Sequence, residues 1–149
     1  MYVSNEIQAL EEQHDVIDQF NQASSITIPS SDGKYRIATI YRSPNSSESN
    51  NNALEWLVDF LSIDKTIFIG DFNYGQINWK DSSITQPCRS AEKFRNVCTD
   101  NFLKQYVDFG TRKERILNLV LATQGANVSE ITDEGKLVNA DHVALSFRF

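Results

Sequence analysis

The sequence predicts a single mixed α/β (α+β) domain, and three observations support this class. The chain has 149 residues, the size of one domain with its own core. Hydrophobic residues make up 40% of the chain and aromatic residues 11%, which is too much core material for a disordered protein. Short β-branched and aromatic runs alternate with segments of helical periodicity, so we expect strands and helices to be interleaved.

The first expected elements are a weak helix and a β-hairpin. Apolar residues recur at near-helical spacing over residues 6–20, which is typical of an amphipathic helix or a mobile lead segment. Residues 24–28 and 35–41 are rich in β-branched and aromatic side chains. The intervening sequence Pro-Ser-Ser-Asp-Gly, residues 29–33, has the composition of a hairpin loop, so two antiparallel strands are expected.

A helix and a central strand follow. Apolar side chains recur with a period near 3.6 over residues 52–62, after Asn51 and Asn52, which are good N-caps. Residues 66–69, Thr-Ile-Phe-Ile, are apolar on both faces, as in a strand that is covered on both sides. This strand runs into the polar sequence Gly-Asp-Phe-Asn.

The second half of the chain predicts one more helix and two more strands. Ser90 is placed to cap a helix that extends through about residue 101. Residues 116–122 form an apolar run typical of a buried strand. Apolar residues alternate with smaller or charged ones over residues 143–149, which indicates a last strand.

The charge balance excludes a protein that binds its partners through a broad basic surface. Lysine and arginine number 14 against 20 aspartate and glutamate residues, a formal net charge of −6. Contact with nucleic acid must therefore be local. The sequence Arg-Lys-Glu-Arg, residues 112–115, is a candidate for such a contact, and a solvated loop is the plainer interpretation.

The cysteines and the N-terminus predict an intracellular protein, cytoplasmic or nuclear rather than secreted. Cys88 and Cys98 cannot form a disulfide-dense scaffold, and neither has the spacing of a zinc site. The first residues lack the basic and apolar regions of a signal peptide, and no apolar run approaches the ~20 residues that cross a bilayer. We therefore expect no membrane partner. No small organic cofactor is expected either.

Polar clusters follow three of the predicted strands, where α/β proteins place reactive groups. The first cluster is Tyr-Arg-Ser-Pro-Asn, residues 41–45. The second contains Asp71 and Asn73, which an extended backbone would place on one side, where they could orient a water and steady a charged oxygen. The third is Asn-Ala-Asp-His, residues 139–142. Taken alone, the first two clusters are also compatible with an ordinary turn, and the histidine of the third with a satisfied surface or core residue.

Asn118 connects the predicted strand over residues 116–122 with the third polar cluster. It lies in the sequence Ile-Leu-Asn-Leu-Val-Leu, where both faces of the strand are apolar, so its amide is expected to be buried and hydrogen-bonded. His142 is the natural partner, since a fixed side chain that holds an imidazole sets the tautomer of that ring.

Taken together and in order, these motifs resemble the endonuclease/exonuclease/phosphatase superfamily. The sequences that carry the resemblance are Ile-Tyr-Arg-Ser-Pro-Asn, Ile-Phe-Ile-Gly-Asp-Phe-Asn, Gly-Thr-Arg, Ile-Leu-Asn-Leu-Val-Leu and Ala-Asp-His. Within that superfamily the motifs resemble the apurinic-endonuclease-like domain of non-LTR retrotransposons. The resemblance implies a two-sheet β-sandwich flanked by helices, here residues 24–149, preceded by a variable lead segment, residues 1–23.

The resemblance also implies roles for individual residues. Asp71 would orient or deprotonate the attacking water, Asn73 would stabilise developing charge, and His142 would bind and polarise the scissile phosphate. Tyr41 would contact the phosphate from the first cluster. These roles suit phosphoryl transfer, in which a protein mainly positions groups and stabilises charge.

Two further residues complete the implied site. Asn45 matches a phosphate-contacting position. Asp141 matches an acidic residue near the metal, so Asp141 and Asp71 are the expected ligands of Mg²⁺ or Mn²⁺, hard cations that prefer oxygen. DNA is the expected partner, and the oligomeric state is left open.

Two departures from the family pattern shape the functional expectation. The family has an Asn and a metal-holding Glu on strands upstream of the matching region, so we expect this domain to be incomplete at its N-terminus. Asn118 stands where the family has Asp, and an amide cannot stabilise an imidazolium by charge. In serine proteases the analogous exchange lowers turnover about 10⁴-fold.

The expected function is that of a metal-dependent phosphodiesterase or endonuclease-type domain of retroelement origin. It would act on DNA when complete and be weak or inactive as this chain. Two alternatives are a non-catalytic remnant that binds nucleic acid or a protein, and a phosphatase of the same superfamily, since specificity resides in loops rather than in the shared core.

Overall fold

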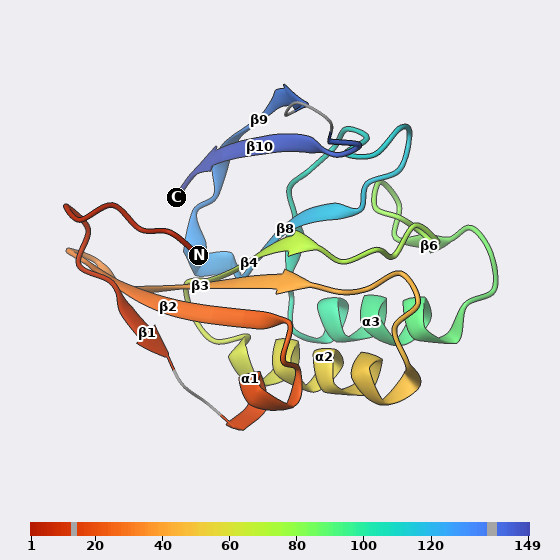
Figure 1. The fold of residues 1–149 in the computed structure, drawn as a ribbon, viewed down its shortest axis with the longest axis horizontal. Coiled ribbons are helices and arrows are strands. Elements are labelled where there is room, and N and C mark those ends of the chain that lie inside the picture. Colours follow the sequence, from red (N-terminus) through yellow and green to blue (C-terminus); the bar gives the residue numbers. More distant parts are fainter. Residues whose placement is uncertain (13–14, 137–139) are drawn as a thin grey trace.

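The computed structural model describes residues 1–12, 15–136 and 140–149, and they form three layers (Figure 1). The helices lie below a six-stranded sheet, and a two-stranded ribbon lies above it. The strands of the large sheet follow the order β1 (Leu10–Glu12), β2 (Ala23–Ser30), β3 (Gly33–Tyr41), β4 (Thr66–Asp71), β8 (Asn118–Ala122) and β7 (Lys104–Gln105). The helices are α1 (Asp15–Gln19), α2 (Glu48–Leu61) and α3 (Arg89–Asp100), and a 3₁₀ turn, η1, spans Gln124–Ala126.

The predicted hairpin is confirmed and is tighter than expected. Strands β2 and β3 pair in antiparallel register from Ala23↔Ile40 to Ser30↔Gly33, so Pro29 is part of a strand and only two residues make the turn. Strand β3 then pairs in parallel with β4 after the crossover through α2. The predicted central strand is thus β4, which lies between β3 and β8.

Both predicted helices exist, but their starts were predicted wrongly. Helix α2 begins at Glu48 because Ser47 is the N-cap and its hydroxyl accepts the N–H of Asn50. Asn51 is therefore buried inside the helix instead of capping it. Helix α3 begins at Arg89, with Cys88 as its N-cap, so Ser90 lies within the helix.

A large apolar core joins the helices to the lower face of the sheet. Its members come from α2, α3 and alternate positions of β3, β4 and β8. Ile17 and Phe20, from the predicted lead segment, are also buried in it, and β1 extends the sheet by pairing with β2. Residues 6–20 thus contain one short helix and one strand in their described part, instead of one long helix.

A second apolar core lies between the upper face of the sheet and the ribbon. The ribbon consists of β9 (Ser129–Lys136) and β10 (Val143–Arg148), which pair in antiparallel register. Leu145 and Phe147 of β10 pack toward Ile67, Val120 and Ala122 of the large sheet. Strand β8 begins at Asn118, two residues later than predicted. The remaining strands, β5 (Ile77–Asn78) and β6 (Ser83–Ile84), form a small hairpin.

This arrangement confirms the predicted mixed α/β class with sheets and helices. Among the residues that the structure describes, no helix is long and apolar enough to cross a membrane.

Candidate active site

Three neighbouring strands bring three of the predicted site residues into one row. In the sheet register Tyr41 of β3 is opposite Asp71 of β4, and Asp71 is opposite Asn118 of β8. Adjacent strands are about 4.8 Å apart, so these residues are immediate neighbours across the sheet. Because side chains alternate along a strand, Asp71 and Asn118 share the face of Ile69 and Val120, which is the face toward the ribbon.

The backbone around Asp71 depends on a close approach between β3 and β4. Gly70 has φ +143, and a Cβ atom there would lie 1.8 Å from the carbonyl oxygen of Ile40. Any side chain at position 70 would therefore force β4 away from β3. The glycine of the Gly-Asp-Phe-Asn sequence thus allows the end of β4, with Asp71, to stay in the sheet.

Asn73 lies beside Asp71, but not through the extended backbone that we predicted. The strand ends at Asp71, and Asn73 has φ +51, in the left-handed region. The N–H of Asn73 donates to Asp71 Oδ1 at 3.2 Å, and Asn73 Nδ2 donates to the carbonyl of Arg42 at 2.8 Å. A tight turn rather than strand periodicity therefore sets the position of Asn73.

The buried side chain of Arg42 stabilises this turn. Its side chain is 5% exposed, and Nη1 donates to the carbonyls of Phe72 and Asn73 at 3.3 and 3.2 Å. Nε donates to Asn51 Oδ1 at 2.8 Å, and the guanidinium lies 4.0 Å from the centre of the Tyr74 ring. The backbone N–H of Arg42 also donates to the carbonyl of Asp71 at 2.8 Å. This role of Arg42 was not predicted, because the only indication in the sequence was that Arg42 lies within the first polar cluster.

His142 lies on the ribbon side of the site, directly before β10. Its Nδ1 lies 2.9 Å from Asn118 Oδ1, which confirms the predicted pairing of these two side chains. Its Nε2 lies 4.0 Å from Asp71 Oδ2 and 3.8 Å from Asp141 Oδ1. The side chains of His142 and Asp71 are each 22% exposed, so both remain accessible to a small group in solution. Asn118 itself is half-buried rather than fully buried as predicted.

The electrostatic environment of Asp71 is mixed. Burial raises the pKa of Asp71 above the ordinary value for aspartate. His142, the hydrogen bonds from Asn73 and the charge of Arg112 lower this pKa without cancelling the effect of burial. The carboxyl group therefore accepts a proton more readily than an exposed aspartate does, which suits a group that takes a proton from water.

Asp141 forms an ion pair in the structure. Its Oδ2 lies 2.6 Å from Arg112 Nη2, and both side chains are substantially exposed. No group of three or more His, Cys, Asp or Glu side chains is arranged to hold a metal ion in the described ranges. Asp71 and Asp141 alone do not complete a metal site, and Arg112 competes for one of them. Asn139, from the same predicted cluster, lies outside the described residues.

The two predicted phosphate-contacting residues lie at the end of β3 and in the turn that follows it. Tyr41 is half exposed at the end of β3, in the same row as Asp71. Asn45 is exposed in the turn after β3, four residues further along the chain.

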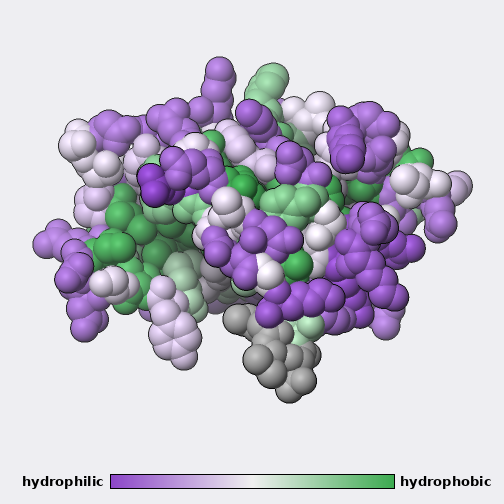
Figure 2. All heavy atoms as spheres, turned by 90° about the horizontal axis from the view of Figure 1, so that it is seen from above, coloured by the Kyte–Doolittle hydropathy of each residue, from purple (hydrophilic) through white to green (hydrophobic). Residues whose placement is uncertain are grey.

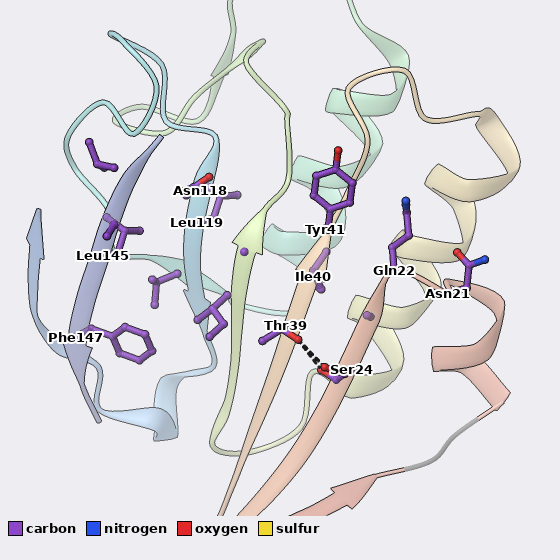
Figure 3. Close-up of a pocket in the computed structure, with 16 residues that line it drawn as sticks. Asn21, Gln22, Ser24, Thr39, Ile40, Tyr41, Asn118, Leu119, Leu145 and Phe147 are labelled. Atoms are coloured by element: carbon purple, nitrogen blue, oxygen red, sulfur yellow. Dashed lines mark hydrogen bonds between the residues drawn. The ribbon is translucent and has the colours of Figure 1, made fainter. Parts of the chain in front are cut away.

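A cavity of about 540 Å³ opens beside the site, between the upper face of the sheet and β10. In Figure 3, Tyr41 and Asn118 lie at one end of it, and Leu145 and Phe147 of β10 line one side. Ser24 and Thr39, hydrogen-bonded at 2.7 Å, lie at the other side. Figure 2, which looks onto this side of the molecule, shows apolar residues among the polar ones.

Comparison with solved structures identifies the class of fold. The structure is similar to the endonuclease domain of TRAS1, a telomere-specific non-LTR retrotransposon, with a TM-score of 0.70 and 14% sequence identity. The match covers 95% of this chain and 66% of that chain, so this chain spans less than two thirds of the similar structure. The fold is therefore of the endonuclease/exonuclease/phosphatase type.

The sequence identifies the family within that class. The family model described as endonuclease-reverse transcriptase matches residues 35–146, and the chain belongs to this family. The matched range contains all the site residues described above. A search of curated proteins found no match. The resemblance predicted from the ordered motifs is thus confirmed.

Proposed function

We propose that this chain is an endonuclease-type domain of retroelement origin that hydrolyses phosphodiester bonds in DNA, with low activity as the isolated chain. The observation that carries the proposal is the convergence of Asp71, Asn73, Asn118 and His142 within the matched family range. A carboxylate with a raised pKa, an imidazole and an amide around one small space suit the hydrolysis of a phosphate ester. The TRAS1 match supports DNA as the substrate.

In this proposal Asp71 and His142, whose Oδ2 and Nε2 atoms are 4.0 Å apart, act together at the scissile phosphate. Asp71 orients the attacking water and accepts its proton, because its raised pKa favours proton uptake. His142, with its ring protonated at both nitrogens, donates a hydrogen bond from Nε2 to a phosphate oxygen. Asn118, which is neutral, orients the imidazole through Nδ1 but adds no charge to stabilise an imidazolium. This difference from a carboxylate is one reason to expect slow turnover.

Tyr41, Asn45 and Asn73 have supporting roles. Tyr41 and Asn45 contact the phosphate backbone from the strand end and the turn that follows β3. Asn73 stabilises the charge that develops on the phosphate. Because the chain carries a net charge of −6, contacts to DNA must be local, and Arg112, which pairs with the exposed Asp141, is a cation that could make such a contact.

We propose Mg²⁺ or Mn²⁺ as the cofactor, on the basis of the family. Such a cation would supply positive charge near the phosphate, and proteins often bind Mg²⁺ through one or two carboxylates, waters and substrate phosphates. Asp71 and Asp141 are the carboxylates available in the described part of the chain, and they do not make a complete site. Binding in the absence of DNA should therefore be weak, which is a second reason to expect slow turnover.

The two free thiols support an intracellular setting for this function. Cys98 is buried and Cys88 is half-buried, and neither is paired. We propose a reducing compartment, the cytoplasm or the nucleus.

The reaction class can be tested with matched substrates. The purified chain, in excess over substrate, would be incubated with supercoiled plasmid and separately with a phosphomonoester, p-nitrophenyl phosphate, each with Mg²⁺, Mn²⁺ or a chelator. We expect slow plasmid nicking that requires the cation and no release of nitrophenol. Hydrolysis of the monoester alone would replace the endonuclease proposal with the phosphatase alternative, and activity toward neither substrate would favour the non-catalytic alternative.

A further inference from the structure

Thr111 is a buried polar residue that contacts both strands of the Asn118–His142 pair. It is fully buried and lies in the Gly-Thr-Arg sequence, ahead of β8. Its hydroxyl oxygen accepts the backbone N–H groups of Leu117 and Asn118, each at 2.9 Å. Its carbonyl accepts the N–H of Val143 at 3.0 Å. One residue thus bonds to Asn118 on β8 and to the residue that follows His142.

The position of Thr111 is important because β8 and β10 belong to different sheets. Strand β8 is in the large sheet and β10 pairs with β9, so in the described ranges no sheet ladder joins β8 to β10. The distance between Asn118 and His142 is therefore not fixed by regular strand pairing. The bonds from Thr111 supply a fixed link between the two strands at this level.

The geometry of His142 depends on that link. Asn118 Oδ1 accepts a hydrogen bond from Nδ1 of His142, so the neutral ring carries its proton on Nδ1. The Nε2 atom, without a proton, then faces Asp71 and Asp141. A shift of β10 relative to β8 would break the 2.9 Å contact between His142 Nδ1 and Asn118 Oδ1. Neither the orientation nor the tautomer of the ring would then be fixed.

We infer that Thr111 is a positioning residue that sets the orientation and tautomer of His142 by bonding β8 to the start of β10. The inference deepens the proposed function where it concerns cleavage, whereas the tautomer of His142 can be measured whether or not the chain cleaves DNA.

The direct test is ¹⁵N NMR of the imidazole rings in the full chain, without metal, at about pH 8.5, well above the pKa of free imidazole. The chain contains two histidines, so His14 is an internal reference. We expect His142 to be in the Nδ1–H form in the natural chain and in Thr111→Ser, which keeps the hydroxyl. Thr111→Val should shift His142 toward the Nε2–H form.

Thr123→Val is the matched control. Thr123 is also buried, and its hydroxyl accepts the N–H of Thr66 at 2.9 Å, at the opposite end of β8. Its loss should lower stability to a similar degree without moving the His142 signals. In the plasmid assay we expect Thr111→Val to reduce cleavage about 10²-fold, the loss typical of a 1 Å misplacement, while Thr123→Val cleaves normally.

Three results would overturn the inference. They are an Nε2–H form of His142 in the natural chain, an unchanged tautomer in folded Thr111→Val, and an equal shift in Thr123→Val. If Thr111→Val does not fold, hydrogen exchange of the natural chain and of Thr111→Ser decides. The amides of Leu117, Asn118 and Val143 must then exchange together in both proteins, and separate rates would contradict a shared link. If the expected tautomer changes occur but the chain does not cleave DNA, the result contradicts the proposed function and leaves this inference standing.

Discussion

At the scale of single residues, the chemical role proposed for Asp71 opposes stability. Burial raises the pKa of Asp71, so the folded chain holds this proton more tightly than the unfolded chain does. Ionisation therefore lowers the free energy of unfolding as the pH rises through the raised pKa, and this loss is absent below the ordinary pKa of aspartate. Asp71→Asn should raise the free energy of unfolding at about pH 8 but not at about pH 3, and it should abolish cleavage.

Denaturant unfolding at the two pH values measures this effect. Asp100→Asn is the control, because Asp100 is exposed at the end of α3. An equal gain in the free energy of unfolding at both pH values, or no gain at pH 8, would show that ionised Asp71 does not destabilise the fold.

Arg42 provides a second prediction at this scale. Lysine keeps the positive charge but cannot reproduce the guanidinium fork that bonds Asn51 and the carbonyls of Phe72 and Asn73. Arg42→Lys should therefore lower the free energy of unfolding by about 1–3 kcal/mol and slow cleavage. The exposed Arg89→Lys is the control. Unchanged unfolding midpoints in both variants would mean that the turn does not depend on Arg42.

Sequence reasoning predicted the pair of Asn118 and His142, because an amide in an apolar strand requires a partner. It did not predict the roles of Arg42 and Thr111. Most of their hydrogen bonds go to backbone groups outside their own strand or turn, and such contacts leave no pattern in a single sequence. It also placed Asn73 beside Asp71 for the wrong reason, since a left-handed turn and not an extended strand makes the contact.

At the scale of elements, β1 depends on one ionised side chain. The Glu12 carboxylate accepts hydrogen bonds from Ser25 at 2.9 Å, from Thr27 at 2.5 Å, and from Arg36 at 2.5 and 2.9 Å. Burial alone would raise the pKa of Glu12, but these bonds, led by Arg36, lower it to about 2. The resulting stability is complete above about pH 4.5 and is lost as the pH falls toward 2.

Glu12→Gln should therefore loosen β1 at neutral pH, at a loss of about 1–3 kcal/mol. Hydrogen exchange of the β1 and β2 amides measures the loss, and Glu11→Gln, which alters an exposed neighbour, is the control. We expect faster exchange only in Glu12→Gln. Equal protection in both variants would contradict the role of this ion pair.

The elements differ in how visible they are in the sequence. Apolar periodicity predicted α2, α3, the β2–β3 hairpin and the central strand β4, since each buries a regular face. Strand β1 was not predicted, because the three residues Leu-Glu-Glu have no strand pattern and are held by the distant Arg36. The start of α2 was missed because Ser47, not the asparagines, supplies the cap.

At the scale of the whole molecule, the ribbon leaves part of the upper sheet face uncovered. The cavity there is lined by apolar side chains of the large sheet and of β10, among them Ile69, Val120, Leu145 and Phe147. A hydrophobic dye such as anilinonaphthalene sulfonate should therefore fluoresce with the native chain. Leu145→Gln should weaken this signal, whereas Leu10→Gln, at an exposed site away from the cavity, should not. Absence of dye binding by the folded chain would show that this face is closed in solution.

The central claim is that Asp71 and His142 form a nuclease site, and plasmid nicking under enzyme excess with Mg²⁺ tests it most directly. The natural chain, Asp71→Ala, His142→Ala and the control Asp100→Ala would be purified identically and compared by the rate at which supercoiled DNA becomes nicked. We predict slow nicking by the natural chain and by Asp100→Ala, with losses of at least about 10²-fold in Asp71→Ala and His142→Ala. Nicking that persists in Asp71→Ala, or its absence from the folded natural chain, would contradict the claim.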